Sequence, residues 1–126
     1  MEERRHDDRR KAPSYPWYVR DYAEDEAVKL MTYEQEGVYR RLLDHQWFHG
    51  GLPGDVRQVA SLVPKVTFQR FLKVIWPSMV GKFSRAPDGR LVNPKLERVR
   101  VDVAEFKRKK SEAGKRGASV RWPEAV

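Results

Sequence analysis

The stretch 32–54 constrains the fold most, because it contains signals for both ends of a helix. Thr32 and Gln35 have the spacing of a capping box, in which the Thr hydroxyl accepts a backbone N–H of the first turn and the Gln side chain reaches back. Apolar residues then recur at helical steps, at Val38, Tyr39, Leu42, Leu43 and Trp47. Gly50-Gly51-Leu52-Pro53-Gly54 ends this pattern. The sequence predicts a helix from about Tyr33 to Phe48.

Two shorter helices are predicted to follow. Asp55 can cap the first of them, whose apolar residues are Val56, Val59, Ala60 and Leu62, and Pro64 closes it. Thr67 can cap the second, whose apolar stripe is formed by Phe68, Phe71, Leu72 and Ile75. Pro77 should end or kink that helix near Trp76, because proline lacks the backbone N–H that a helix needs.

The pattern changes after Met79. Residues 80–84 and 90–92 read as two short strands around the turn Ala86-Pro87-Asp88-Gly89. Asn93-Pro94 then begins a last helix with proline at its first position. One apolar seam is formed by Leu96, Val99, Val103 and Phe106, and it stops at Phe106.

Both ends of the chain are highly charged and lack apolar periodicity. We expect residues 1–13 to be a disordered leader, residues 14–106 to form the domain, and residues 107–126 to be a basic, flexible tail that orders only on a partner. Within the domain, the alternation of Tyr15, Trp17 and Val19 predicts a half-buried extended segment. We expect this segment to approach the backbone of Gly37 closely. The aromatic residues Tyr15, Trp17, Tyr39, Trp47 and Phe48 are interpreted as core.

This order of elements predicts a mostly α fold with a small β-hairpin, an α+β class. An extended segment, three helices, a hairpin and a last helix is the order of a winged-helix domain, a helix-turn-helix variant. Another small α+β arrangement of the same elements stays open.

Charge and composition narrow the class of function. The chain has 126 residues and a net charge of +8, and residues 94–126 hold ten basic against five acidic groups. It has no cysteine, which excludes disulfides and thiolate metal sites. There is neither an apolar run of about 18 residues nor an apolar leader after Met1, so we expect a cytoplasmic protein without a membrane partner.

Signals for catalysis are weak. His45 and His49 are four residues apart and could share a helix face, but Gln46 stands where a zinc protease motif needs Glu. The acidic run 21–26 is interpreted as a surface patch. The glycine-rich segment 50–54 lacks the Lys-Ser/Thr of a phosphate loop. We therefore expect no enzyme, no cofactor and no metal.

The candidate nucleic-acid contacts form three groups. The third helix would present Gln69, Arg70 and Lys73, either to the major groove of DNA or simply to solvent. The wing offers Lys82, Arg85 and Arg90 to the adjacent phosphate backbone or to the minor groove. The tail is the strongest candidate and contains Lys107, Arg108, Lys109, Lys110, Lys115, Arg116, Arg121 and Trp122. Trp122 could stack on a base or pack back on the domain.

Several runs of residues resemble a phage and prophage family. They are Tyr15-Pro16-Trp17-Tyr18 with Asp21-Tyr22, the block LMTYEQEGVYRRLLDHQW over residues 30–47, Gly51-Leu52-Pro53, Asp88-Gly89-Arg90 with Asn93 and Leu96, and KSEAGKRGA over residues 110–118 with Arg121-Trp122. The family is the YdaU-like group of uncharacterised proteins, whose domain forms the N-terminal, winged-helix-like part of proteins linked to phage replication initiation. The resemblance implies a DNA transaction rather than a mechanism.

We therefore expect a phage-type DNA-binding domain that acts in replication initiation or a related transaction and binds phosphates through its tail and wing. Its partner would be DNA, duplex in preference to single strand. The alternative is a protein-interaction module, or a phage-encoded inhibitor, that binds a replisome or host protein. We expect a monomer or a weak homodimer paired through the seam at Leu96–Phe106.

Overall fold

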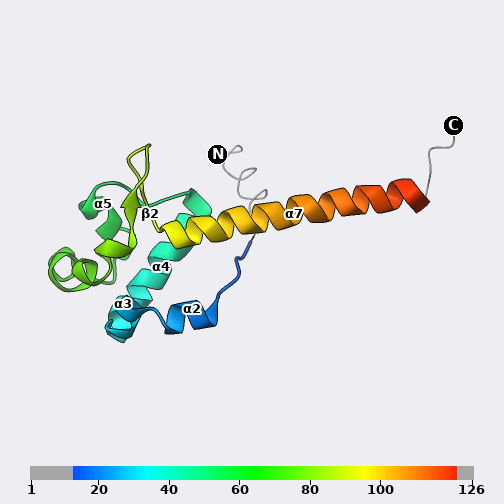
Figure 1. Cartoon of the computed structure of the whole chain (residues 1–126). Helices are drawn as coiled ribbons and strands as arrows, with labels where there is room; N and C mark the ends of the chain where they lie inside the picture. Colours follow the sequence, from blue (N-terminus) through cyan, green and yellow to red (C-terminus); the bar gives the residue numbers. More distant parts are fainter. Residues whose placement is uncertain (1–12, 122–126) are drawn as a thin grey trace.

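The computed structural model describes residues 13–121, and its order of elements is shown in Figure 1. Two short helices, α2 (Val19–Ala23) and α3 (Glu26–Lys29), precede the central helix α4 (Tyr33–His49). After α5 (Val56–Ala60), one helical segment comprises α6 (Phe68–Arg70), the π-helical η1 (Phe71–Ile75) and the 3-10 turn η2 (Trp76–Ser78). The turn η3 (Val80–Lys82), the strands β1 (Ser84–Arg85) and β2 (Leu91–Val92), and the long helix α7 (Pro94–Arg121) complete it. The predicted mostly α fold with a small β-hairpin is confirmed.

The predicted starts of α4, α5 and α6 and the predicted end of α4 are confirmed by their local chemistry, whereas α5 ends at Ala60, before the predicted Leu62 and Pro64. Thr32 and Gln35 form both bonds of the capping box, with the Gln35 N–H donating to Thr32 Oγ1 at 3.2 Å and the Thr32 N–H donating to Gln35 Oε1 at 2.7 Å. Gly50 ends α4 with a φ of 84°, a left-handed conformation that glycine adopts without a steric penalty. Asp55 and Thr67 accept backbone N–H groups at the starts of α5 and α6.

The third helix differs from the regular α-helix that its stripe predicts. The Trp76 N–H donates to the Phe71 carbonyl, five residues back, and a 3-10 turn follows at Pro77. Because Pro77 has no N–H to continue the α-helical ladder, the helix changes its pitch just before it. Gln35 Nε2 donates to the Val74 carbonyl at 2.9 Å, which ties the start of α4 to this π turn.

The hairpin is shorter than predicted. The strands pair antiparallel, with Ser84 opposite Val92, but residues 80–82 form a 3-10 turn and no strand. A helical turn here places Met79 and Phe83, four residues apart, in the core together. The predicted tight turn at 86–89 is confirmed, with Gly89 at a φ of 89°. Leu52 also bridges to Leu91, through N–H to carbonyl distances of 2.7 and 2.9 Å.

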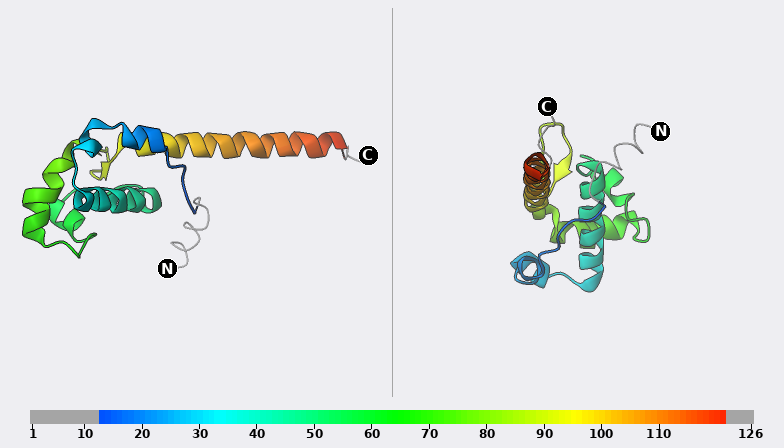
Figure 2. Two further views of the ribbon diagram at one scale, coloured as in Figure 1. Left: turned by 90° about the horizontal axis from the view of Figure 1, so that it is seen from below. Right: turned by 90° about the vertical axis from the view of Figure 1, so that its right-hand side faces the viewer.

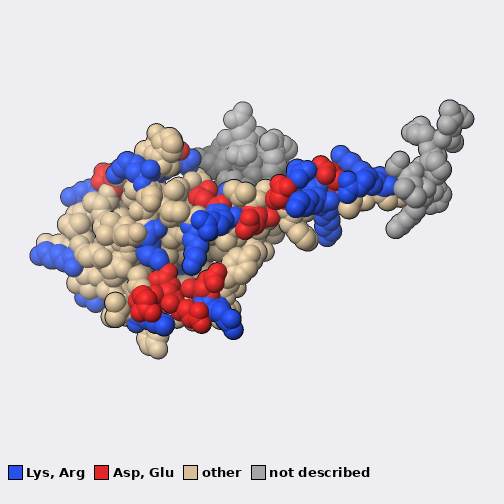
Figure 3. Space-filling model, viewed as in Figure 1, with Lys and Arg blue, Asp and Glu red and all other residues tan. Residues whose placement is uncertain are grey.

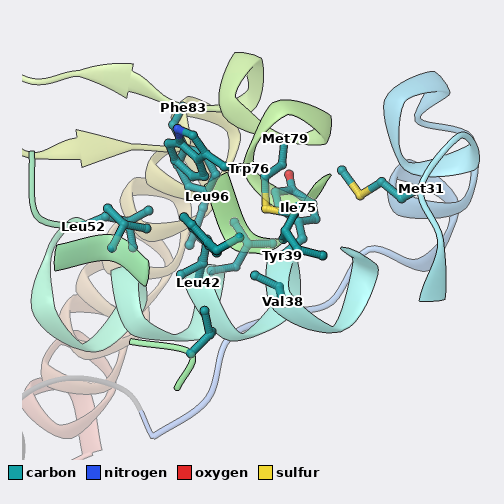
Figure 4. Packing of buried hydrophobic residues seen from close by; sticks show 14 of the residues in the cluster. Met31, Val38, Tyr39, Leu42, Leu52, Ile75, Trp76, Met79, Phe83 and Leu96 are labelled. Carbon is teal, nitrogen blue, oxygen red and sulfur yellow. The ribbon is translucent and has the colours of Figure 1, made fainter. Parts of the chain in front are cut away.

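The core lies where α4 crosses the third helical segment and the base of α7 (Figure 4). Its fully buried members include Leu42, Leu52, Phe71 and Ile75. Tyr39 and Trp47 are buried as expected, whereas Phe48 is wrongly placed in the core by the prediction, since 39% of its surface is exposed. It follows Trp47 on the helix and therefore points to a different side.

The N-terminal segment departs from two predictions. Tyr15 and Trp17 are half-buried as predicted and pack against the core cluster, but Val19 begins α2 and is exposed. The expected close approach to Gly37 is wrong, because a Cβ built there meets nothing within 4 Å. The Tyr15 ring lies 4.8 Å from the ring of Trp47 instead, so this segment covers the end of α4 that holds Trp47.

The first turns of helix α7 pack against the elements that precede it, which together form the body of the molecule. The rest of α7 then projects from this body as a single rod (Figure 2). Leu96 and Val99 are buried in the core, while Phe106 is 68% exposed, so the predicted seam is divided between body and rod. The expectation that order ends at Phe106 is corrected, because α7 continues to Arg121. Lys, Arg, Glu and Ala favour helix, and Arg108 bridges Glu105 and Glu112 along one face.

Candidate nucleic-acid interface

The third helical segment presents its predicted contact residues to solvent, but one of them is already paired. Gln69, Arg70 and Lys73 are all exposed. Arg70 binds the Glu34 carboxylate with both Nε and Nη2, at 3.0 and 2.6 Å. Hydrogen bonding from this guanidinium holds the pKa of Glu34 below its ordinary value. Among the described residues, Gln69 and Lys73 therefore remain as the uncommitted polar groups of this segment.

The wing cations are used inside the protein. Lys82 forms an ion pair with Asp25, the residue that caps α3. Arg85 donates to the carbonyls of Gly89 and Gly54, at 2.8 and 3.3 Å. Arg90 binds Asp88 and also donates from Nη1 to the His49 carbonyl at 2.5 Å. Lys82 therefore ties η3 to the start of α3, and Arg85 and Arg90 hold the hairpin against the end of α4 and the loop after it. The charges of Lys82 and Arg90 are each balanced by a carboxylate, whereas Arg85 is exposed and donates to neutral carbonyls only.

A buried hydrogen-bond network fixes the direction in which α7 leaves the body. Gln46 on α4 is fully buried, and its side chain accepts from the Asn93 N–H at 2.7 Å and donates to the Asn93 carbonyl at 3.1 Å. The Asn93 amide donates to the Tyr39 hydroxyl at 2.9 Å, and Asn93 Oδ1 accepts the Leu96 N–H at 3.1 Å as the cap of α7. Tyr39 and Gln46, the residues at the two ends of this network, both belong to α4.

Arg100 closes the same junction one turn further along α7. Its Nη2 donates to the carbonyls of Gln46 and Trp47, at 2.9 and 2.7 Å, and its guanidinium lies 4.6 Å from the centre of the Trp47 ring. These carbonyls belong to the last turn of α4, where the helix dipole favours a cation. The rod is therefore attached rigidly, and its distal cations are carried at a fixed orientation to the body.

The distal part of α7 holds the accessible positive charge. Arg108 is bound by Glu105 and Glu112, but the other cations of residues 107–117 are exposed and form no hydrogen bond or salt bridge within the described part of the chain: Lys107, Lys109, Lys110, Lys115 and Arg116. Figure 3 shows blue side chains around this part of the rod. Arg121 is the last residue of the helix, and Trp122 lies outside the described residues.

The acidic and histidine residues form no recognisable metal centre. Within residues 13–121, no three His, Cys, Asp or Glu side chains lie together as metal ligands would. The rings of His45 and His49 stack at 4.3 Å, and burial together with the neighbouring His49 lowers the pKa of His45. The acidic residues of α2 and α3 form a surface patch, which is red in Figure 3. This patch lies on the body and the basic rod points away from it.

The sequence analysis missed two cations at the base of α7 and the cleft beside them. A cleft of about 320 Å³ lies between residues 15–25 and the first turns of α7, and its wall includes Lys95 and Arg98. Aromatic side chains of Tyr15, Trp17, Tyr22 and Tyr39 line its other side. Arg98 precedes the seam residue Val99, so helical spacing could have located Arg98 beside the apolar seam. The cleft could not have been located in this way, because it depends on the path of residues 15–25.

Comparisons with known proteins do not assign the chain to a family. No protein-family model matches the chain, and no curated protein or solved structure matches it either. Among the described residues, α7 and the other helices are too short or too polar to cross a membrane.

Proposed function

We propose that this protein binds DNA and that the distal half of α7 supplies most of the phosphate contacts. The observation that carries the proposal is the placement of five exposed, unpaired cations within eleven described residues of one projecting helix. Lys and Arg near phosphates release condensed counterions, which supplies a large part of the affinity for DNA. Solubility alone does not require such a concentration of one charge on one helix.

The arrangement of the body supports a winged-helix reading. Helix α4, the extended residue Leu52, helix α5, the third helical segment and the hairpin follow one another, and Leu52 bridges to Leu91 of β2. In such a domain the third helix faces the DNA, where Gln69 and Lys73 would contact the duplex. We propose that these residues set the register, that Lys82, Arg85 and Arg90 stabilise the wing, and that α7 supplies the affinity.

The resemblance to the YdaU-like phage proteins suggests the biological setting. The motifs at residues 15–22, 30–47 and 110–118 carry this part of the proposal. We propose a role in phage or prophage replication initiation or a related DNA transaction, with the body acting as a scaffold and without catalysis by this chain.

A charge-matched comparison tests the proposal. The variant Lys107→Gln/Lys109→Gln/Lys110→Gln and the control Arg20→Gln/Arg41→Gln/Lys65→Gln both lower the net charge from +8 by three, and all six residues are exposed. We expect the α7 variant to lose at least tenfold in affinity for a random duplex at 100 mM salt, measured by fluorescence anisotropy, and the control to lose less than threefold. Equal losses in both variants would reject α7 as the site.

A second function, binding of a partner protein, is favoured by a different observation. Leu30 and Tyr33, at the turn between α3 and α4, are 86% and 91% exposed. Large apolar side chains this exposed on neighbouring positions are typical of an interaction surface. Binding there would survive Lys107→Gln/Lys109→Gln/Lys110→Gln and would depend weakly on salt, whereas DNA binding by α7 would fall steeply with ionic strength.

A further inference from the structure

The cations of distal α7 surround the helix and do not lie on one face. With a step of about 100° per residue, Lys107 and Arg116 point in opposite directions, about 180° apart. Lys110 and Lys115 lie between them on the two remaining sides, about 140° apart from each other. All four side chains are exposed and unpaired within the described part of the rod.

This distribution excludes some ways of binding a polyanion. A helix that rests on a flat surface can use the cations of one side only. A membrane-surface helix also needs an apolar face, and residues 107–117 contain no large apolar residue. Residues 107–117 contain no aromatic side chain for stacking on unpaired bases either. The opposed cations are used together only where negative charge lies on both sides of the helix.

The major groove of duplex DNA provides such a place. It is about 12 Å wide, has a phosphate backbone along each wall, and admits an α-helix of about 10–12 Å in diameter. Within 107–117, the single acidic residue is Glu112, and Arg108 already neutralises it at 2.7 Å. The side of the helix that carries Ala113 and Gly117 lies between Lys110 and Arg116, and its small residues would let the helix sit deep in the groove.

We propose that the distal half of α7 enters the major groove of duplex DNA and contacts the phosphates of both walls. This inference rests on the proposed DNA-binding function and adds its mode and its substrate class. The Gln46–Asn93 and Arg100 contacts fix the rod to the body, so the helix would be presented as a preformed element. The body then lies beside the duplex at one end of the inserted helix.

Binding by the full chain to three probes tests the mode. The probes are a 20-base-pair DNA duplex, an RNA duplex of the same sequence and the corresponding single-stranded DNA. The major groove of A-form RNA is too deep and narrow for a helix, although its phosphate charge is similar. We expect at least tenfold tighter binding to duplex DNA than to duplex RNA or single-stranded DNA, measured by anisotropy between about 50 and 200 mM salt.

Single neutralisations then test whether both sides of the helix are in contact. Lys107→Gln and Arg116→Gln should each lower the slope of log affinity against log salt by about 0.9, and the exposed body control Lys65→Gln should leave it unchanged. Equal affinity for the two duplexes, or an effect of only one of the two α7 variants, would overturn insertion while leaving DNA binding in place. Lack of binding to all three probes would overturn the proposed function and the inference with it.

Discussion

Gln46 determines how the two parts of the molecule are joined, although it has no charge and no contact with the proposed ligand. Its amide satisfies both backbone groups of Asn93 and also donates to Glu97 at 2.8 Å. A buried amide suits this place because an apolar side chain of similar size would leave the Asn93 N–H without a partner. The first turn of α7 is therefore set by side-chain chemistry as well as by its proline.

Replacement of Gln46 by leucine should destabilise the protein strongly. Gln46→Leu removes three hydrogen bonds and leaves the Asn93 N–H unsatisfied, although the Asn93 carbonyl still accepts the Glu97 N–H at 3.2 Å, so we expect a loss of about 2 kcal/mol in the free energy of unfolding. Urea denaturation followed by circular dichroism measures this loss. The matched change Gln58→Leu, at an exposed position of α5, should stay within about 0.5 kcal/mol of the parent. Similar values for the two variants would contradict the role of Gln46.

Asp25 should give the protein part of its sensitivity to acid. Burial opposes ionisation of this carboxylate, but hydrogen bonds from Lys82 and from the Val28 N–H outweigh that effect and lower its pKa. The ionised form therefore stabilises the fold above the unfolded-state pKa of about 3.9, and the contribution is lost as the pH falls through the lower folded-state pKa. Asp25→Asn should cost stability at pH 6 and less at pH 3 in urea titrations. The control Gln58→Asn, at an exposed position without a titratable side chain, should cost the same at both.

At the scale of elements, the parts whose ends are marked by local chemistry could be predicted from the sequence. The capping box at Thr32, the αL glycine at Gly50 and the turn at Gly89 each require only neighbouring residues, and each is confirmed. Pro77 predicts a change in the third helix near Trp76, and the structure has it there, but the π form of the turn before Pro77 and the 3-10 turn at 80–82 could not be predicted, because they depend on which side chains the core accepts. Local patterns do not contain that information.

Two glycines of the helices should respond to alanine in opposite directions. Gly114 lies within α7, where a Cβ meets nothing within 4 Å, so Gly114→Ala should stabilise the rod locally by about 1 kcal/mol. Amide hydrogen exchange around residue 114 should then slow about fivefold.

Gly50 has a φ of 84°, and a Cβ would lie 3.2 Å from Arg90 Nη1, so Gly50→Ala should lower the free energy of unfolding by about 1 kcal/mol or more. Stabilisation by Gly50→Ala would contradict the αL cap.

At the scale of the whole molecule, the cations predicted to bind DNA fall into two groups: some form contacts inside the protein, and the others are accessible to a ligand. Sequence patterns identify which residues are basic but do not show which carboxylate or carbonyl each one faces. Lys82 pairs with a residue 57 positions away, and Arg90 reaches the end of α4. The cations on α7 are accessible because their neighbours on that helix are mostly basic or small, which the sequence does show. The tail prediction therefore located accessible charge, although its expected flexibility was replaced by a helix.

The body and the rod should be independent in stability. All the buried core residues among those described precede residue 100, and the exposed Phe106 already lies on the rod. A chain that ends at Phe106 should therefore unfold within about 2 °C of the full chain and with nearly the same dependence on urea, because the surface exposed on unfolding changes little. The same truncation should remove most of the affinity for duplex DNA, since it removes the five unpaired cations of α7. A large fall in the melting temperature would show that residues beyond 106 pack on the body, and unchanged affinity would locate the phosphate contacts on the body.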